Sequence, residues 1–457
     1  MDDRLLDLDI TDVAHGGVFV GRHEGRVVFV PDAIPGERVR VRVTDAGDAA
    51  SKSFWRGEVL EVLDASPHRR PHVWRQADVD VPPEDRPGGA DFGHIELEHQ
   101  RTLKTRVLRD ALERIGRMPD TAVTLEPATP IVSPEGEVVA AETQDGTAWR
   151  TRVSLHVDAE GRVGPYAARS HRIIPVEDHP LATPAIERAA LRLAGGRPGR
   201  IDLVQPSDGR VRVIPRPEIE RPRRQGPRRG GRRAPAPKPQ PSKDDPAFET
   251  VVESVDGRDF RVDAGGFWQV HRLAAHSLSS LVSAQLRAAP AESDGIDPDA
   301  WHLDLYGGVG LFAATLGDLG GEGTRVTSIE SDPRATDHAG ENLAEWVGAR
   351  AETDRVDRWI ARLGDEASVA QRERLSRGVV ILDPPRSGAG RAVVEGVATL
   401  APRTVVYVAC DPVALARDLA TFRERGYETG SIAALDLFPN SHHVEAVATL
   451  TRAHEPR

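Results

Sequence analysis

The N-terminal residues 1–65 alternate short apolar runs with turn-forming residues. Pro35-Gly36 leads into a run in which valine and arginine strictly alternate. Closely spaced runs of this kind, separated by turn signals, are typical of short strands. The runs occupy 18–20, 27–30, 39–43 and 54–63. Several strands this close together predict a small, all-β barrel.

Residues 66–262 follow as a connector and a central domain. The connector, up to about residue 90, is rich in proline, arginine and aspartate. A helix is predicted over 96–115, where apolar residues recur at near-helical spacing, and Gly116 is placed to end it. The remainder has a mainly β pattern, with one helix near 184–193.

A basic insertion rich in proline, arginine and glycine lies near 216–245. Such a composition cannot bury enough apolar surface to offset the entropy of ordering, so we expect a disordered loop. Two interpretations stay open: a solvated insertion without a specific role, or an arm that attracts RNA.

The pattern changes from about residue 263 to residue 457, where helical segments alternate with apolar strands. The candidate strands are 302–305, 325–329, 379–382, 404–408 and 444–450. This alternation predicts a doubly wound, Rossmann-like α/β domain. The expected fold class is therefore α/β, with a small β-barrel in front and a mainly β central domain between.

The composition of the 457 residues fits a globular protein with two or three domains, with 29 % charged and 39 % hydrophobic residues. No apolar stretch is long enough to span a bilayer, and the first residues do not resemble a signal peptide. We therefore expect a cytoplasmic protein. A net charge of −11 argues against a general nucleic-acid coat but leaves room for local RNA binding.

Cys410 is the only cysteine, and it follows an apolar β-type run and precedes Asp411-Pro412. A single thiol forms neither an intrachain disulfide nor a multi-cysteine metal site, whereas it can be a nucleophile. A lone cysteine is commonly a small buried hydrophobe. The neighbouring motifs favour the nucleophile, and the helix predicted from about Val413 is expected to lower the thiol pKa.

A glycine-rich turn links a predicted strand to a helix at 303–312, and it contains Gly307, Gly308 and Gly310. Glycine lets the backbone approach a ligand closely. The next strand ends at Glu330, whose carboxylate can accept hydrogen bonds from ribose hydroxyls. Together they predict a nucleoside-cofactor site, and the glycine pattern differs from the dinucleotide fingerprint and is closer to the S-adenosylmethionine type.

Two more carboxylates lie at predicted strand ends. Asp383 follows an apolar strand and opens the loop Asp383-Pro384-Pro385-Arg386, where it is expected to line the pocket between cofactor and substrate. Glu445 begins the last strand and is a candidate general base. For His442 and His443 we expect packing or hydrogen bonding, and we predict no metal site.

Taken together, these segments resemble the S-adenosylmethionine-dependent RNA uracil-5-methyltransferases. The match of residues 29–39 is to a TRAM domain, an OB-like RNA-binding barrel. The most specific motifs are Asp383-Pro384-Pro385-Arg386, Cys410-Asp411-Pro412 and His442-His443-Val444-Glu445, in this order. The resemblance implies methylation of uridine C5 in transfer or ribosomal RNA through a covalent adduct of a cysteine with uracil C6.

The resemblance also implies residue roles. Cys410 matches the nucleophile, Glu445 the general base and Asp383 the aspartate between cofactor and uracil. The matching positions for cofactor contacts are Gln269, Tyr306, Gly308, Leu311, Glu330 and Asp383.

Three positions depart from the family pattern. Asp411 replaces an asparagine, Gly307 stands where a cysteine is common, and His271 ends the segment that begins at Phe267. The charge of Asp411 is expected to raise the pKa of the neighbouring thiol. Some members also hold an iron–sulfur cluster, which needs four cysteines. The corresponding region has none, and His179 stands where a cysteine is usual, so we predict no cluster.

Two other functions remain open from the sequence. One is a catalytically silent RNA-binding homologue, and the other is a methyltransferase that acts on a base nitrogen and needs no cysteine. Replacing Cys410 with alanine discriminates between a C5 enzyme and the latter. We expect a monomer without an obligate protein partner or a membrane.

Overall fold

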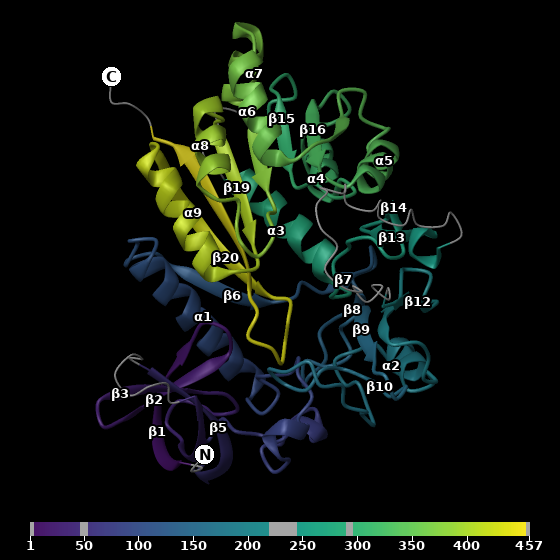
Figure 1. The fold of residues 1–457 in the computed structure, drawn as a ribbon. Helices are drawn as coiled ribbons and strands as arrows, with labels where there is room; N and C mark the ends of the chain where they lie inside the picture. The colour runs from purple at the N-terminus through teal and green to yellow at the C-terminus, as the bar shows by residue number, and fades with distance from the viewer. Residues whose placement is uncertain (1–3, 46–53, 219–244, 289–295, 454–457) are drawn as a thin grey trace, which may run out of the picture.

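The computed structural model describes residues 4–45, 54–218, 245–288 and 296–453. The predicted basic insertion near 216–245 lies almost wholly outside these residues. Three modules are visible in Figure 1: a barrel at the lower left, a central β module at the lower right, and a large α/β layer above both. Among the described residues, no helix is long and apolar enough to cross a bilayer.

The N-terminal module is a closed five-stranded barrel in the order β1-β2-β3-β5-β4. Buried and exposed side chains alternate along its strands, which is why its valines fill the interior while its arginines face water. The first strand had no counterpart among the sequence predictions. The five strands are β1 Leu5–Ala14, β2 Val18–His23, β3 Arg26–Val30, β4 Arg38–Asp45 and β5 Phe54–Asp64.

A connector leads from the barrel to helix α1 (Leu97–Arg114), which agrees with the predicted helix to within a residue at each end. Gly116 follows it at the predicted end. Leu108 and Leu112 on α1 are buried in the same core as α9 (Pro412–Glu424) of the α/β layer. This helix therefore connects the barrel side of the molecule to the α/β layer.

The central module is mainly β, as predicted. Its largest sheet has the order β10-β9-β11-β12 and carries the short helix α2 (Pro184–Ala190). The strands of this sheet are β9 Arg152–Val157, β10 Val163–Gly164, β11 Gly199–Val204 and β12 Arg212–Pro217. Two hairpins complete the module: β7 Ile131–Val132 with β8 Val138–Ala140, and β13 Thr250–Val255 with β14 Arg258–Asp263.

The C-terminal module is built on an eight-stranded sheet in the order β17-β16-β15-β18-β19-β21-β20-β6. Strands β17 to β19 in this order are parallel, and β21 pairs antiparallel with both of its neighbours. The strands are β6 Val123–Pro127, β15 His302–Leu305, β16 Val326–Glu330, β17 Arg350–Thr353, β18 Val379–Leu382, β19 Thr404–Ala409, β20 Tyr427–Asp436 and β21 Glu445–Arg452.

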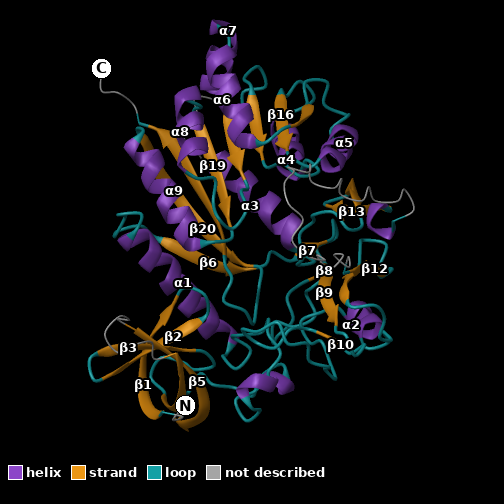
Figure 2. Ribbon diagram, in the orientation of Figure 1, coloured by secondary structure: helices purple, strands orange, loops and turns teal. Residues whose placement is uncertain are grey.

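Helices cover both faces of this sheet (Figure 2). Alternate residues of β18 enter two separate cores: Val379 and Ile381 pack with α3 and α4, and Val380 and Leu382 pack with α6, α8 and α9. The described helices here are α3 Ala274–Ala288, α4 Leu311–Gly320, α5 Pro333–Asn342, α6 Val356–Glu366, α7 Val369–Arg377, α8 Arg391–Leu400 and α9. The predicted doubly wound α/β fold is confirmed.

One strand crosses the predicted domain limits, which otherwise remain predictions. β6 belongs by sequence to the central domain, yet it pairs in parallel with β20 at the edge of the large sheet, Val123 opposite Ile432. The chain order around β15 also fixes a switch point: β16 and β17 lie on one side of β15, and β18 and β19 lie on the other. In such sheets, ligands bind outside the carboxyl ends of the strands at that point.

Candidate active site

A cavity of about 850 Å³ opens at the carboxyl ends of the central parallel strands. Seven of the eight residues singled out from the sequence line it. These are Gln269, Tyr306, Gly308, Glu330, Asp383, Cys410 and Glu445. Leu311 is the exception, because it is only 8 % exposed and packs in the core beneath α4. The cavity lining does not support its assignment as a cofactor contact.

The glycine turn is shaped by backbone conformations that most residues avoid. Tyr306 has φ 66° and Gly308 has φ 55°, and for a non-glycine residue this conformation costs energy that is typically spent at functional sites. Gly307 has no room for a side chain, since a methyl group there would overlap the Ser328 hydroxyl and lie 2.6 Å from the Asp304 carboxylate. Steric crowding therefore explains why this position, where the family pattern often has cysteine, holds glycine here.

Asp304, inside β15, supports this turn from below and was not singled out from the sequence. One oxygen of its fully buried carboxyl accepts hydrogen bonds from the Ala313 amide and the Ser328 hydroxyl, both at 3.1 Å. Burial raises its pKa to about 7. The acidic residue in the middle of an apolar strand was the signal that could have revealed it.

Glu330 stands at the end of β16 with its carboxylate fixed by backbone donors. One oxygen accepts from the Gly308 amide at 3.2 Å, and the other accepts from the amides of Ser331 and Asp332 at 2.5 and 2.9 Å. Each carboxylate oxygen has two lone pairs. The oxygen that accepts from Gly308 retains capacity for a further donor, whereas the other also accepts from the Ser331 hydroxyl at 3.0 Å and is fully engaged. This geometry suits recognition of a ribose hydroxyl through the open oxygen.

Cys410 lies between the end of β19 and the start of α9. Asp411 caps the helix, since one of its oxygens accepts from the Ala414 amide at 2.8 Å. Its other oxygen lies 2.9 Å from Nε2 of His15, in the barrel turn between β1 and β2. Both oxygens of Asp411 are thus engaged away from the thiol.

The pKa of Cys410 is raised to about 12, chiefly by burial and then by the charges of Glu445 and Asp383, while Arg386 lowers it. The prediction of a lowered thiol pKa was wrong for the protein without ligands, because desolvation and the two carboxylates raise it. Asp411 is not among the causes, so the raised pKa comes from groups inside the cavity.

The pKa values of the two carboxyl groups in the cavity are also raised. Burial, with the charge of Asp304, raises the pKa of Asp383 to about 7. Burial, with the charge of Asp383, raises the pKa of Glu445 well above its usual value, although Arg386 opposes this. Strongly shifted groups that meet in one cavity are typical of catalytic sites.

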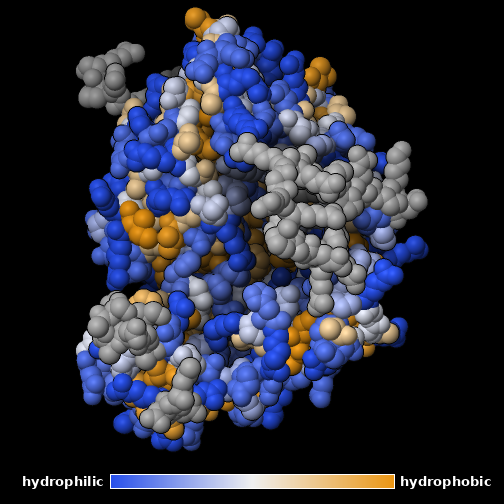
Figure 3. Space-filling view, in the orientation of Figure 1, coloured by the Kyte–Doolittle hydropathy of each residue, from blue (hydrophilic) through white to orange (hydrophobic). Residues whose placement is uncertain are grey.

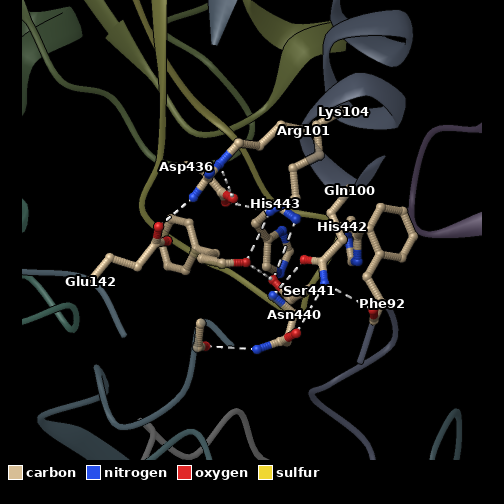
Figure 4. A network of polar contacts seen from close by, with 12 residues as sticks. Phe92, Gln100, Arg101, Lys104, Glu142, Asp436, Asn440, Ser441, His442 and His443 are labelled. Carbon is tan, nitrogen blue, oxygen red and sulfur yellow. Dashed lines mark hydrogen bonds and ion pairs between the residues drawn. The ribbon is translucent and has the colours of Figure 1, made fainter. Parts of the chain in front are cut away.

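The loop that leads into Glu445 is anchored by a polar network (Figure 4). At its start, Asp436 accepts from Nζ of Lys104 on α1 at 2.5 Å, and both side chains are buried. Within the loop, the Asn440 side chain accepts from Gln100 at 2.9 Å, and Nδ1 of His442 lies 2.6 Å from Asp91. The base candidate therefore sits on a rigid support.

Of the two histidines His443 and His271, only His443 lines the cavity. Nε2 of His443 lies 3.2 Å from Arg386, and burial lowers the pKa of His443 to about 3, so it is neutral. His271 does not line the cavity; it is buried against Trp149, and its Nδ1 accepts from the Leu273 amide at 3.0 Å. Within the described ranges, no cluster of three or more potential metal ligands is present.

Sequence reasoning gave no role to four further residues of the cavity wall. Arg150 enters from the central module and Arg386 from the Asp383 loop, and with Arg355 they bring three arginines to the cavity wall. Phe267, two residues before Gln269, is 73 % exposed at the same cavity. Its place in the cavity lining, rather than its exposure alone, makes this ring a candidate contact for a ligand.

Comparison with known proteins places the chain in a family. Residues 4–53 match the TRAM domain model, and residues 361–453 match the model described as tRNA (Uracil-5-)-methyltransferase. An uncharacterized RNA methyltransferase of Streptomyces avermitilis is 37 % identical, with 98 % of each chain covered. The chain belongs to the RNA methyltransferase family. The resemblance stated from the motifs is thereby confirmed.

More distant relatives of this RNA methyltransferase have named substrates. A 23S rRNA (uracil(1939)-C(5))-methyltransferase of Shewanella denitrificans is 27 % identical over 97 % of this chain and 95 % of its own. The solved tRNA (uracil-54, C5)-methyltransferase of Pyrococcus abyssi, in complex with S-adenosyl-L-homocysteine, is 20 % identical with a TM-score of 0.63. It covers 97 % of this chain and 99 % of its own, so the whole fold is shared.

Proposed function

We propose that this RNA methyltransferase transfers a methyl group from S-adenosylmethionine to C5 of a uridine in transfer or ribosomal RNA, through a covalent bond between Cys410 and uracil C6. The observation that carries the proposal is that a thiol and two carboxylates, Cys410, Asp383 and Glu445, share one cavity with the glycine turn. The substrates named for the two uracil-C5 relatives support the same chemistry.

The cofactor half of the cavity fits an adenosine-containing ligand. Glu330 would accept a hydrogen bond from a ribose hydroxyl through its open oxygen, while Tyr306 and Gly308 form the wall that the nucleoside approaches. Gln269 also lines the cavity, from the segment that precedes α3. When bound, S-adenosylmethionine supplies a methyl group on a positively charged sulfonium.

Cys410 begins the reaction on the uracil. Its thiolate adds to C6, and the electrons of the C5–C6 double bond move to C5, which becomes the nucleophile that accepts the methyl group. Without ligands the thiol is protonated. The positive charge of a bound sulfonium beside Cys410, Asp383 and Glu445 would lower the pKa values of all three groups. Thiolate formation is therefore coupled to the filling of the cavity.

Glu445 and Asp383 complete the cycle. After transfer, Glu445 removes the C5 proton; the C5–C6 double bond re-forms and the thiolate leaves. Asp383, as a carboxylate, accepts a hydrogen bond from uracil N3–H, which cytosine lacks. The protein would select uracil by this contact.

RNA delivery is assigned to the barrel and the rim of the cavity. The TRAM barrel contacts the catalytic module through His15 and Asp411, next to the nucleophile. Phe267 offers an exposed ring at the cavity for stacking with an extruded base. The net charge of −11 restricts RNA binding to local surfaces of this kind.

The decisive experiment is tritium release from unmodified tRNA and rRNA transcripts labelled at uracil C5, with S-adenosylmethionine and the full chain. We expect release from one RNA class and its loss in Cys410→Ala, with cofactor binding retained. Methyl transfer without tritium release, insensitive to Cys410→Ala, would instead identify a base-nitrogen methyltransferase. RNA and cofactor binding without any transfer would identify a catalytically silent homologue.

A further inference from the structure

We infer that a second cavity, beside the active site, binds an unpaired nucleotide of the same RNA strand that carries the target uridine. This cavity has a volume of about 600 Å³ and lies where the central sheet meets the connector. The inference rests on the proposed function for the identity of the strand. It adds a subsite that the reaction itself does not use.

The second cavity adjoins the active-site cavity directly. Both cavities are lined by Arg150, Gly266 and Val270, so the two cavities share one wall. Arg150 projects from the chain just before β9, which forms part of the floor of the second cavity. A nucleotide next to the extruded uridine would reach this space without leaving the protein surface. In Figure 3 the visible face is hollowed where the upper layer meets the lower modules.

An aromatic pair stands in the wall of this cavity. The rings of His156 and Tyr166 are stacked with centroids 3.7 Å apart and an interplanar angle of 17°, and His171 meets Tyr166 edge-on at 5.2 Å. Burial, aided by Arg200, lowers the pKa of His156, which keeps this imidazole neutral. Aromatic side chains are the platforms on which bases of single-stranded RNA stack.

The platform is held rigidly. The Tyr166 carbonyl accepts from the Gly88 amide at 3.0 Å, and the Ala167 amide donates to the Arg172 carbonyl at 2.7 Å. These bonds tie the Tyr166 loop to the connector on one side and to its own return strand on the other. A base that stacks here therefore meets a surface that needs little reordering.

The charge of the cavity is opposite to that of the whole protein. Its wall contains four arginines and a single acidic residue, Asp202. The arginines are Arg150, Arg152, Arg169 and Arg200. A local excess of guanidinium groups in a chain with net charge −11 indicates an anionic ligand.

Two of these arginines have no carboxylate partner among the described residues. Arg152 pairs with Glu253 at 3.2 Å and Arg200 pairs with Asp202 at 3.0 Å, whereas no ion pair is formed by Arg150 or Arg169 within the described ranges. Arg169 is exposed and is held at φ 57°, a conformation that costs energy in a non-glycine residue. A phosphate would supply the missing counter-charge.

Aromatic rings and unpaired guanidinium groups in one space match the two halves of a nucleotide. The base would stack on the Tyr166–His156 pair, and the phosphate would contact Arg169, with Arg150 on the side of the active site. A free nucleotide has the same chemistry, but the shared wall with the active site favours a nucleotide within the RNA strand.

The test measures binding of a 5′-fluorescein-labelled decauridylate to the full chain by fluorescence anisotropy. We expect Tyr166→Ala to weaken binding about tenfold, because stacking on an aromatic ring is lost, while Tyr166→Phe stays within about twofold of the parent. Arg169→Ala should weaken binding and reduce the slope of log K against log salt by about 0.7, the value of one phosphate contact to a single strand.

Arg192→Ala is the matched control, since this arginine is exposed on the same module and does not line the cavity. It should bind like the parent. Parental affinity in both Tyr166→Ala and Arg169→Ala would overturn the inference. Competition by uridine monophosphate as effective, per nucleotide, as the unlabelled decamer would also overturn it, in favour of a free nucleotide.

Tritium release, measured on the same variants, separates this inference from the proposed function. If Cys410→Ala abolishes release but the Tyr166 and Arg169 variants leave affinity unchanged, only the subsite is wrong. If no transcript releases tritium and the Tyr166 and Arg169 variants still lose affinity as expected, the nucleotide site stands and the proposed C5 chemistry fails.

Discussion

Asp383 is the residue whose ionisation is most clearly affected by burial in the cavity. In the folded protein its pKa is about 7, against a usual 3.8, because burial and the nearby Asp304 disfavour the ionised form. An acid whose pKa is raised by folding binds more protons in the folded state than in the unfolded state. Its ionisation therefore lowers the stability of the protein as the pH rises from about 4 to about 7.

We accordingly predict that Asp383→Asn stabilises the ligand-free protein while abolishing methyl transfer. The gain in unfolding free energy should be small near pH 4, grow through neutral pH and level off above it, reaching about 1–3 kcal/mol at pH 8. Urea unfolding at several pH values measures it. The exposed Asp337→Asn on α5 serves as control, with an expected change below about 0.5 kcal/mol throughout. An equal gain for Asp383→Asn at pH 4 and pH 8 would contradict this account.

Gly307 carries a second prediction at this scale. In Gly307→Ala the new methyl group would collide with the Ser328 hydroxyl and the Asp304 carboxylate, so the turn must move and Glu330 loses its alignment with Gly308. We expect S-adenosylmethionine binding to weaken by at least about tenfold, since a single misplaced contact costs about 1.4 kcal/mol or more. Isothermal titration calorimetry measures it.

Gly364→Ala on α6 is the matched control, because open space surrounds this glycine. Alanine in a helix should leave cofactor binding unchanged and stabilise the fold by about 0.4–1 kcal/mol. Normal cofactor affinity in Gly307→Ala would show that the turn accommodates a side chain and that its shape is not what the ligand requires.

At the scale of elements, the local sequence patterns predicted individual strands and helices better than they predicted which strands pair. The run 379–382 and the tip Asp383 could be read from the sequence because a buried parallel strand is a continuous apolar run with a polar end. The parallel pairing of β6 with β20 joins residues about 300 apart in sequence, and no local signal encodes it. The place of Arg150 in the cavity wall could not be predicted for the same reason, because the chain brings this residue to the cavity from a different module.

The pKa of Cys410 could not be predicted locally either. The helix start after Cys410 was visible in the sequence, whereas the approach of Glu445 and Asp383 depends on the packing of three strand ends. The role of Leu311 was implied by the resemblance to the family, whereas its side chain, in the first turn of α4, packs in the core. Motif position alone does not fix the direction of a side chain.

The buried ion pair between Lys104 on α1 and Asp436 on β20 leads to a prediction about how these two elements are held together. Asp436→Asn leaves the buried ammonium of Lys104 without its counter-charge, which should cost about 3–5 kcal/mol of unfolding free energy. The double variant Lys104→Met/Asp436→Leu should recover most of this loss, since it removes the buried charge pair while Arg101 keeps Glu98 and Glu142 as partners. Guanidinium unfolding monitored by circular dichroism measures both.

Arg114→Ala on the same helix is the comparison for a surface pair. Its partner Asp110 is four residues away and both side chains are largely exposed, so the expected loss is below about 0.5 kcal/mol. A loss of the same size in Asp436→Asn would mean that water reaches Lys104 and that the network in Figure 4 does not anchor the Glu445 loop.

At the scale of the whole molecule, the barrel meets the catalytic module through one tight turn. Gly16 and Gly17 both have positive φ values, 86° and 71°. Open space surrounds Gly16, whereas a methyl group on Gly17 would overlap the Asp91 carboxylate and lie 2.9 Å from Cβ of His442. Asp91 in turn holds His442, three residues before Glu445. The turn therefore links barrel docking to the loop that carries the base.

Two neighbouring substitutions isolate this link. Gly16→Ala and Gly17→Ala bear the same backbone penalty for a positive φ, about 1 kcal/mol, so they should destabilise the barrel alike. Only Gly17→Ala pushes the barrel away from Asp91 and His442, so we expect this variant to raise KM for RNA and to lower kcat about tenfold or more. Gly16→Ala should stay within about twofold of the parent, because misplacing the general base Glu445 costs far more catalytic rate than a strained turn in the barrel. Steady-state tritium release measures both constants. Parental kinetics in both variants would show that the barrel binds RNA without aligning Glu445. A matching loss in both variants would assign the effect to strain within the barrel.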